Sequence, residues 1–203
     1  MHPAIGVVVG YILGSIPFAY LAGRAVRGID LREHGSGNLG ATNVYRTLGA
    51  KVAAVVFLFD LLKGAAPVWM VLRFGRGEHV LAWAIAAGIA AIAGHAKPIF
   101  LLWRGGGKGV ATATGVFLAL APVPTLVAVG SWVAVVALSG YVSLGSLVAA
   151  VALPIAIEAL LGIHAIVFPA SVALGVFVFW SHRANIGRLR RGEEHRFGRK
   201  ASA

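Results

Sequence analysis

The stretch VLAWAIAAGIAAIAGHAKPIFLLWRGGGKGVATATGVFLAL, residues 80–120, contains the pattern that decides how this chain folds. Two long apolar runs flank a short basic segment, Arg-Gly-Gly-Gly-Lys-Gly, at residues 104–109. A transmembrane helix needs about 20 apolar residues, or fewer where the helix is short or the bilayer thins locally. The stretch therefore predicts membrane helices joined by a glycine-rich loop at the membrane–water boundary.

This glycine-rich loop has the composition of a phosphate-binding site. Successive glycines let backbone N–H groups converge on one anion, a following helix adds the positive end of its dipole, and Lys108 supplies a full charge. The loop is not a nucleotide-binding P-loop, because Leu102 and Gly109 stand where that motif needs Gly and Ser or Thr. Taken alone, a flexible basic turn between two membrane helices explains the loop equally well.

The composition of the whole chain indicates an integral membrane protein. Its 203 residues are 59% hydrophobic and only 12% charged, whereas about a quarter of the residues in a soluble domain are charged. The sequence contains no cysteine, which excludes disulfides, thiolate metal sites and cysteine nucleophiles. The net charge of +11 comes mostly from basic residues at the ends of apolar runs, a pattern that fits anionic lipids and phosphorylated substrates better than nucleic acid.

We expect an all-α membrane protein, a bundle of about seven transmembrane helices that forms a single domain, residues 1–203. The expected spans are residues 3–25, with a kink or a close-packing point at 14–17, then 52–74, 80–103, two short helices within 110–138 hinged at Pro122 and Pro124, 144–161 and 165–180. Fifteen of the 18 Lys and Arg residues cluster around residues 26–50, 104–109 and 182–203. These segments, with residues 139–146, are therefore predicted to be cytoplasmic, which places the N-terminus outside and the C-terminus inside. The first span is expected to be a retained helix, not a cleaved signal.

A second glycine-rich segment, GSGNLGATNVYR at residues 35–46, is dense in small hydrogen-bonding side chains. It matches G-x-G-x-x-G, but the dinucleotide fingerprint requires a preceding β-strand, and here a membrane helix and a charged segment precede it. The candidate polar-substrate or phosphate ligands in it are Ser36, Asn38, Thr42, Asn43 and Arg46. The alternative is an ordinary cytoplasmic loop.

Two further clusters lie in or beside expected spans. Asp60 and Lys63 share one helix face, so they can form an ion pair, and a structural pair is as good an interpretation as a direct role on substrate. Ser143 and Ser146 flank an expected helix start, and at least one of them is predicted to cap it.

The last cluster follows the final span. His182 and Asn185 lie on one face if the helix continues; Asn can donate to an oxyanion, and His can orient a hydroxyl or take its proton. Taken alone, the simpler interpretation of this cluster is a helix end at the membrane interface. His95, before the glycine loop, is likewise explained as a packed or headgroup-facing residue at a helix end. A transporter usually holds its polar groups near the midplane of the membrane. The cytoplasmic position of these clusters instead favours an enzyme that acts on phosphorylated lipid precursors.

The loop sequences resemble those of one bacterial enzyme family. Residues 35–49 resemble the first signature of the acyl-phosphate:glycerol-3-phosphate acyltransferases, the PlsY family. Residues 94–100 and 106–112 resemble the second signature, and residues 182–194 the third. The resemblance covers nearly the whole chain. Two departures are Lys97, where an aromatic residue is expected, and a glycine loop that is one residue longer.

The resemblance implies transfer of a fatty acyl group from acyl phosphate to the sn-1 hydroxyl of glycerol 3-phosphate at the cytoplasmic face of a bacterial inner membrane. It implies no cofactor, no metal and no nucleic acid, a monomer, and a soluble enzyme that supplies the acyl phosphate. The implied catalytic residues are Lys108, His182, Asn185, Ser36 and Arg46. The implied substrate-binding residues are Asn38, Thr42, Asn43, Gly106, Gly107, Gly109, Ser143 and Ser146.

Two other functions remain as alternatives. A transporter of phosphorylated compounds would use the same cationic loops and the charges of Asp60 and Lys63. A phosphotransferase for lipid alcohols would need a carboxylate-bound Mg²⁺ site. The cytoplasmic carboxylates show no paired aspartate motif of that kind; they are Asp30, Glu33, Glu193 and Glu194.

Overall fold

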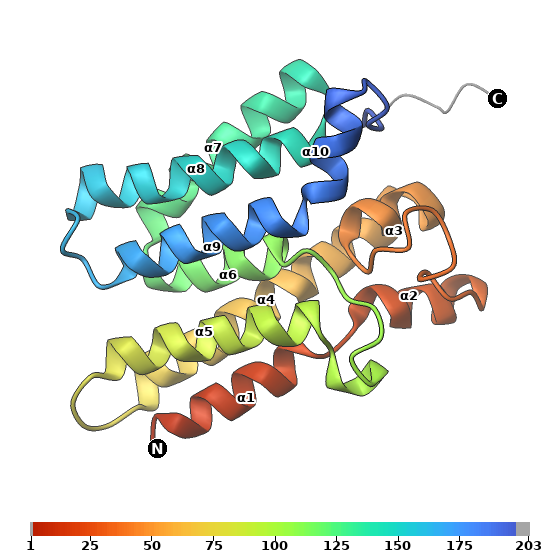
Figure 1. The fold of residues 1–203 in the computed structure, drawn as a ribbon. Helices are drawn as coiled ribbons and strands as arrows, with labels where there is room; N and C mark the ends of the chain where they lie inside the picture. The colour runs from red at the N-terminus through yellow and green to blue at the C-terminus, as the bar shows by residue number, and fades with distance from the viewer. Residues whose placement is uncertain (1, 198–203) are drawn as a thin grey trace. The chain divides into compact units, whose positions relative to one another are not determined.

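The computed structural model describes residues 2–197, and every regular element in that range is a helix (Figure 1). The all-α prediction is therefore confirmed for these residues. Contacts between residues divide the chain into two compact units, Met1–Leu120 (unit 1) and Ala121–Ala203 (unit 2). The organisation as a single domain stays a prediction.

Unit 1 is built on close contacts between apolar helices. Its elements are α1 (Ala4–Gly14), α2 (Phe18–Arg27), α3 (Ala41–Leu48), α4 (Ala50–Phe74), α5 (Val80–Ala96), the 3-10 helix η1 (Ile99–Leu101) and α6 (Val110–Leu120). Helix α1 packs against α5, and α4 packs against α5 and α6. Gly14 of α1 lies directly against the carbonyl of Ala91 in α5, and Gly115 of α6 lies against that of Leu61 in α4. Small residues thus let the helix backbones approach closely, as van der Waals packing between membrane helices requires.

The kink predicted in the first span is confirmed. Helix α1 ends at Gly14 and α2 begins at Phe18, and the two together are long and apolar enough to cross a membrane. Pro17 cannot donate a backbone hydrogen bond, so the helical ladder is interrupted here. The ammonium group of Lys63 in α4 donates to the carbonyl oxygen of Ile16 at 2.8 Å, which satisfies one acceptor in the break.

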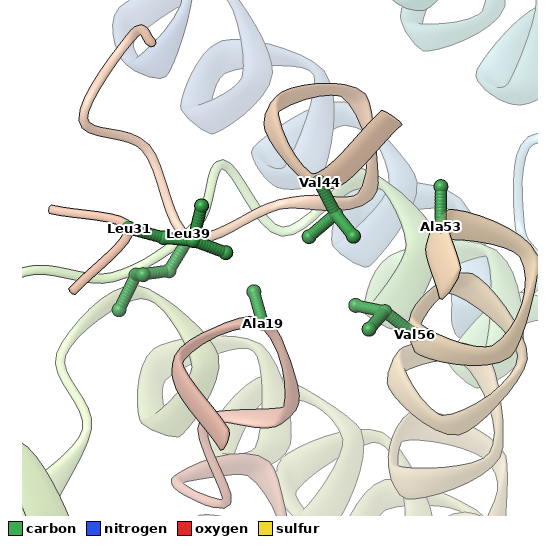
Figure 2. Close-up of a cluster of buried hydrophobic side chains, with 6 residues drawn as sticks. All are labelled: Ala19, Leu31, Leu39, Val44, Ala53 and Val56. Atoms are coloured by element: carbon green, nitrogen blue, oxygen red, sulfur yellow. The ribbon is translucent and has the colours of Figure 1, made fainter. Parts of the chain in front are cut away.

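The segment predicted as one long loop, residues 26–50, is partly helical, because residues 41–48 form α3. Side chains from α2, the loop that follows it, α3 and α4 together form a buried apolar cluster (Figure 2). The cluster comprises Ala19, Leu31, Leu39, Val44, Ala53 and Val56. Residues 41–48 form α3 because Val44 is buried in this cluster and because Gly49 ends the helix at φ +90°.

Unit 2 contains α7 (Pro122–Ser139), α8 (Val142–Leu161), α9 (Val167–Ser181) and α10 (Arg183–Arg190). Helix α8 packs against α7 and α9. The chain bends by 59° between α9 and α10, at His182, so His182 and Asn185 do not continue one straight helix. Residues 182–203 were expected to be a loop-like tail; their first part is helical, and residues 198–203 lie outside the described range.

The loop expected at residues 139–146 is shorter than predicted. Only Gly140, at φ +75°, and Tyr141 separate α7 from α8. Ser143 and Ser146 therefore lie inside the first turns of α8. The prediction that one of them caps the helix is wrong, because neither makes a capping hydrogen bond. Ser146 instead donates to the carbonyl oxygen of Val142 at 3.0 Å.

Within residues 2–197, five helices are long and apolar enough to cross a membrane, and the bent pair α9–α10 is a candidate for a sixth. The predicted break at Pro122 separates α6 from α7. Helix α6 has 11 residues, whereas α7 has 18 and is not the short helix expected. The count of seven crossings and the orientation of the termini stay predictions.

Candidate active site

In unit 1, the glycine-rich loop and the Asn38 segment are joined through one carbonyl group. The oxygen of Gly106 accepts hydrogen bonds from the backbone N–H of Leu39 at 3.1 Å and from the side-chain amide of Asn38 at 3.3 Å. The guanidinium of Arg32 also donates to the carbonyl oxygen of Arg104 at 3.2 Å. Two segments that the sequence singled out separately thus form one polar surface.

The floor of the glycine loop is the C-terminal end of α5. The N–H of Gly107 donates to the carbonyl oxygen of His95 at 3.1 Å. A Cβ atom at Gly107 would overlap the imidazole of His95, and one at Gly106 would overlap the carbonyl oxygen of Ala96. These positions require glycine because the chain passes against its neighbours without room for a side chain. The N–H of Gly107 therefore anchors the loop in this structure, and its use as a donor to phosphate stays a prediction.

Lys108 lies between this anchored loop and the start of α6. Its side chain is half-buried, and Gly109 follows it in the left-handed conformation, φ +80°. Helix α6 begins at the next residue, Val110. A cation and a helix N-terminus are thus adjacent, which is the arrangement expected for anion binding.

Asn43 holds the first glycine-rich segment in shape. Its buried side-chain oxygen accepts from the N–H of Ser36 at 2.9 Å, and its amide donates to the carbonyls of Leu31 at 3.3 Å and His34 at 3.0 Å. These three hydrogen bonds fix residues 31–36 around Asn43, and its role in binding substrate stays a prediction. Ser36 and Arg46 are exposed, whereas Thr42 and Asn38 are half-buried.

An ion pair that the sequence analysis did not assign to the site supports the same segment. Asp30 is buried and accepts hydrogen bonds from the guanidinium of Arg32, the shortest at 2.6 Å from Nη2 to Oδ2. This side-chain hydrogen bonding outweighs the cost of burial and lowers the pKa of Asp30 to about 2. Arg32 therefore joins the Asp30 carboxylate to the backbone of the glycine-rich loop.

In unit 2, the polar side chains converge on the carboxylate of Glu194. Its Oε1 accepts from the hydroxyl of Ser143 at 3.0 Å and from the amide of Asn185 at 2.7 Å, and its Oε2 accepts from the guanidinium of Arg188 at 2.7 Å. Burial alone would raise the pKa of Glu194, but these hydrogen bonds outweigh it and lower that pKa. Glu194 thus fixes the orientation of Asn185 with respect to α8.

His182, at the bend between α9 and α10, is buried. Its Nδ1 lies 2.8 Å from the carbonyl oxygen of Val178. A carbonyl only accepts hydrogen bonds, so this contact assigns a proton to Nδ1 of His182. The bend thus places the imidazole of His182 in the same unit as the amide of Asn185.

The family model described as glycerol-3-phosphate acyltransferase matches residues 4–192. This chain belongs to the glycerol-3-phosphate acyltransferase family. Two curated members are 47% identical over 194 residues, in Synechococcus sp. strain CC9902, and 49% identical over 187 residues, in Geobacter metallireducens. The first match covers 96% of this chain and 94% of the relative, and the second covers 92% of this chain and 93% of the relative.

Two crystal structures of PlsY, an integral membrane glycerol 3-phosphate acyltransferase, are similar to this family member over 97% of its chain. The glycerol 3-phosphate form is 36% identical, with a TM-score of 0.88 and 96% of that chain covered. The lysophosphatidic acid form is 35% identical, with a TM-score of 0.85 and 95% covered. The all-helical membrane architecture is therefore that of a solved family member.

Sequence reasoning on this acyltransferase-family chain missed two carboxylates. Glu194 was noted as part of a signature and among the cytoplasmic carboxylates but was given no role, although acids are rare in this strongly basic tail. Asp30 precedes Arg32 by two residues, a spacing that permits the observed ion pair. Both carboxylates position other groups, which explains why a search for catalytic side chains passed over them.

Proposed function

We propose that this chain transfers a fatty acyl group from acyl phosphate to the sn-1 hydroxyl of glycerol 3-phosphate, giving lysophosphatidic acid and inorganic phosphate. The observation that carries the proposal is the shared carbonyl of Gly106, which joins the Asn38 segment to the glycine loop beside Lys108. Membership of the glycerol-3-phosphate acyltransferase family supports the acceptor.

In this proposal, unit 1 supplies the phosphate-binding groups. Lys108 and Arg46 provide positive charge for the phosphates of the two substrates, and a guanidinium suits bidentate contacts to phosphate. Ser36, Asn38 and Thr42 orient the polar heads of the substrates. Gly106 and Gly109 bring the backbone close enough to an anion at the start of α6.

Unit 2 supplies the groups that act at the reacting carbonyl. The acceptor hydroxyl attacks the carbonyl carbon, the bond from this carbon to the bridging oxygen breaks, and phosphate leaves with the electron pair. Asn185, oriented by Glu194, stabilises the developing oxyanion. His182 orients the hydroxyl through Nε2, and the hydroxyl proton passes either to that nitrogen or to the phosphate oxygen of the donor. Ser143 and Ser146 of α8 help to bind the polar head of a substrate, and Ser143 also donates to Glu194.

Acyl phosphate suits a protein that offers positioning and charge but no cysteine. A mixed anhydride has a good leaving group, so direct attack requires no covalent enzyme intermediate. The protein must then bring the reactants together and stabilise charge, which are the tasks that the two clusters can perform.

We also propose the membrane placement expected from the sequence. It comprises one domain with seven crossings, the N-terminus outside, and loops and tail in the cytoplasm of a bacterial inner membrane. A monomer would receive its donor from a soluble enzyme that forms acyl phosphate. The transporter alternative rests on Asp60 and Lys63, which pair with each other at 2.7 Å, while Lys63 also donates to the helix break. It predicts solute flux without acyl transfer.

The donor can be tested with purified protein in detergent. Palmitoyl phosphate, palmitoyl-CoA and palmitoyl acyl carrier protein are each mixed with glycerol 3-phosphate, and lysophosphatidic acid and phosphate are measured. We expect product from palmitoyl phosphate alone, released with equimolar phosphate. Product only from a thioester would keep the acyl transfer and overturn the donor, and no product from any donor would overturn the proposed reaction.

A further inference from the structure

Three titratable side chains lie buried next to one another in unit 1 and have no part in the reaction described above. Asp60 and Lys63 of α4 and His95 of α5 expose only 1%, 5% and 6% of their surface. The Lys63 ammonium lies 2.7 Å from Oδ1 of Asp60, and Nδ1 of His95 lies 3.6 Å from the same oxygen. Charges inside a membrane segment are costly and tend to mark functional positions.

These side chains line a small cavity beneath the glycine loop. The cavity also touches Ser15, in the break between α1 and α2, and Gly106 of the loop, and it has room for about one water molecule. The hydroxyl of Ser15 is fully buried and has no hydrogen-bond partner among the described residues. A buried hydroxyl of this kind is normally satisfied, so the cavity is suited to a bound water.

His95 connects this buried group to the loop. Its carbonyl oxygen accepts from the N–H of Gly107 at 3.1 Å, and its ring lies where a side chain at position 107 would be. Asp60 is in turn the charged neighbour of that ring, and Lys63 pairs with Asp60. A series of contacts therefore runs from the ion pair in α4, through His95, to the backbone beside Lys108.

We propose that Asp60, Lys63 and His95 form a buried positioning triad that holds the glycine loop in the conformation that receives the phosphate of glycerol 3-phosphate. The proposal rests on the proposed function, in which this loop binds substrate phosphate. His95 contacts the loop, and Asp60 contacts both His95 and Lys63. None of the three has a part in the proposed reaction, so they are positioning residues. Lys63 also ties the triad to the helix break through the carbonyl of Ile16.

A purely structural ion pair makes a different prediction. Replacing a buried pair by apolar residues of similar size is often neutral or stabilising, whereas removing one partner leaves an uncompensated charge. The double variant Asp60→Leu/Lys63→Met therefore keeps the fold if the pair serves packing alone. If Asp60 positions His95, the same double variant is folded but holds the loop poorly.

The experiment measures the Kd of glycerol 3-phosphate by calorimetry, the thermal midpoint in detergent, and KM and kcat with palmitoyl phosphate. We expect the double variant to stay within a few degrees of wild type in its midpoint, to raise Kd and KM for glycerol 3-phosphate about tenfold or more, and to change kcat less. Thr125→Val, a buried hydroxyl change in unit 2, is the control and should leave Kd unchanged.

A second pair of variants tests the contact between His95 and the loop. Gly107→Ala places a methyl group against the imidazole, and His95→Ala removes that ring. We expect the double variant to bind glycerol 3-phosphate several-fold better than the two single effects predict, because the overlap is relieved. Additive effects would overturn the direct contact.

The outcomes separate the triad from the reaction. An unchanged Kd in a folded Asp60→Leu/Lys63→Met variant overturns the triad. Wild-type protein that binds glycerol 3-phosphate but makes no lysophosphatidic acid from palmitoyl phosphate overturns the proposed donor, while the binding constants of the variants still decide the triad.

Discussion

The two polar clusters of this molecule are held together in opposite ways. In unit 1 the glycine loop is fixed by backbone groups, with the carbonyl of Gly106 and the N–H of Gly107 as its main attachments. In unit 2 the cluster is fixed by side chains around the single carboxylate of Glu194. The backbone-held site should be sensitive to any added Cβ, whereas the side-chain-held site depends on one acid.

The largest effect is expected at Glu194. Glu194→Ala removes the acceptor of three buried or half-buried donors, which we expect to cost about 3 kcal/mol of stability and to abolish most activity through misplacement of Asn185. Thermal unfolding in detergent and acyl transfer are the measurements. The matched control is Glu193→Ala, whose exposed partner is Arg191. Equal effects of the two variants would contradict the central role of the Glu194 carboxylate.

The next effect tests the backbone-held site. Gly106→Ala forces a methyl group against the carbonyl oxygen of Ala96, and backbone cannot swing aside as a side chain can. We expect kcat/KM for glycerol 3-phosphate to fall about 10²-fold, with little change in folding. Gly130→Ala is the control, because a Cβ there meets nothing within 4 Å and the residue is helical. Full activity in Gly106→Ala would show that the loop is not held as described.

A smaller effect is expected where a side chain supports unit 1. Asn43→Ala removes three hydrogen bonds that shape residues 31–36, so we expect a rise in KM of about tenfold with kcat less affected. Steady-state kinetics with glycerol 3-phosphate varied would measure it. Asn43→Asp keeps the oxygen that accepts from Ser36 and should recover part of the loss. A fall in kcat alone would instead favour direct action of Asn43 on the reaction.

The smallest effect is a pH dependence. Because the pKa of Asp30 is lowered to about 2 in the folded protein, its ion pair stabilises unit 1 fully above the ordinary Asp value of about 4 and loses this contribution as the pH falls toward 2. Thermal midpoints between pH 5 and pH 2.5 should fall less in Asp30→Asn than in wild type. Parallel curves would exclude Asp30 as the titrating group.

Much of the fold could be predicted from local patterns. Apolar runs locate the membrane helices, and Pro17 and Pro122 locate two breaks, because proline cannot continue a helical ladder. Helix α3 was not predicted, since glycines surround it and its stability comes from burying Val44 in a cluster contributed by distant segments. The cap predicted at Ser143 or Ser146 failed because the chain turns at Gly140, before either serine.

The candidate site was predictable in its residue types but not in its connections. Glycines, amides and cations at the ends of spans identify the phosphate-binding segments from sequence alone. No local pattern shows that the amide of Asn38 reaches Gly106, 68 residues away, or that Ser143 meets Glu194, 51 residues away. These contacts depend on how the helices pack. They distinguish the side chains that hold other groups in place from those proposed to bind substrate.

The most direct test of the account is the initial rate of lysophosphatidic acid formation from palmitoyl phosphate in wild type, Lys108→Ala and Lys51→Ala. Lys51 is an exposed cation at the start of α4 and serves as the matched control. The account predicts a loss of at least about 10²-fold in Lys108→Ala and a rate within about twofold of wild type in Lys51→Ala. A Lys108→Ala rate close to that of wild type would contradict the phosphate-binding role of the glycine loop.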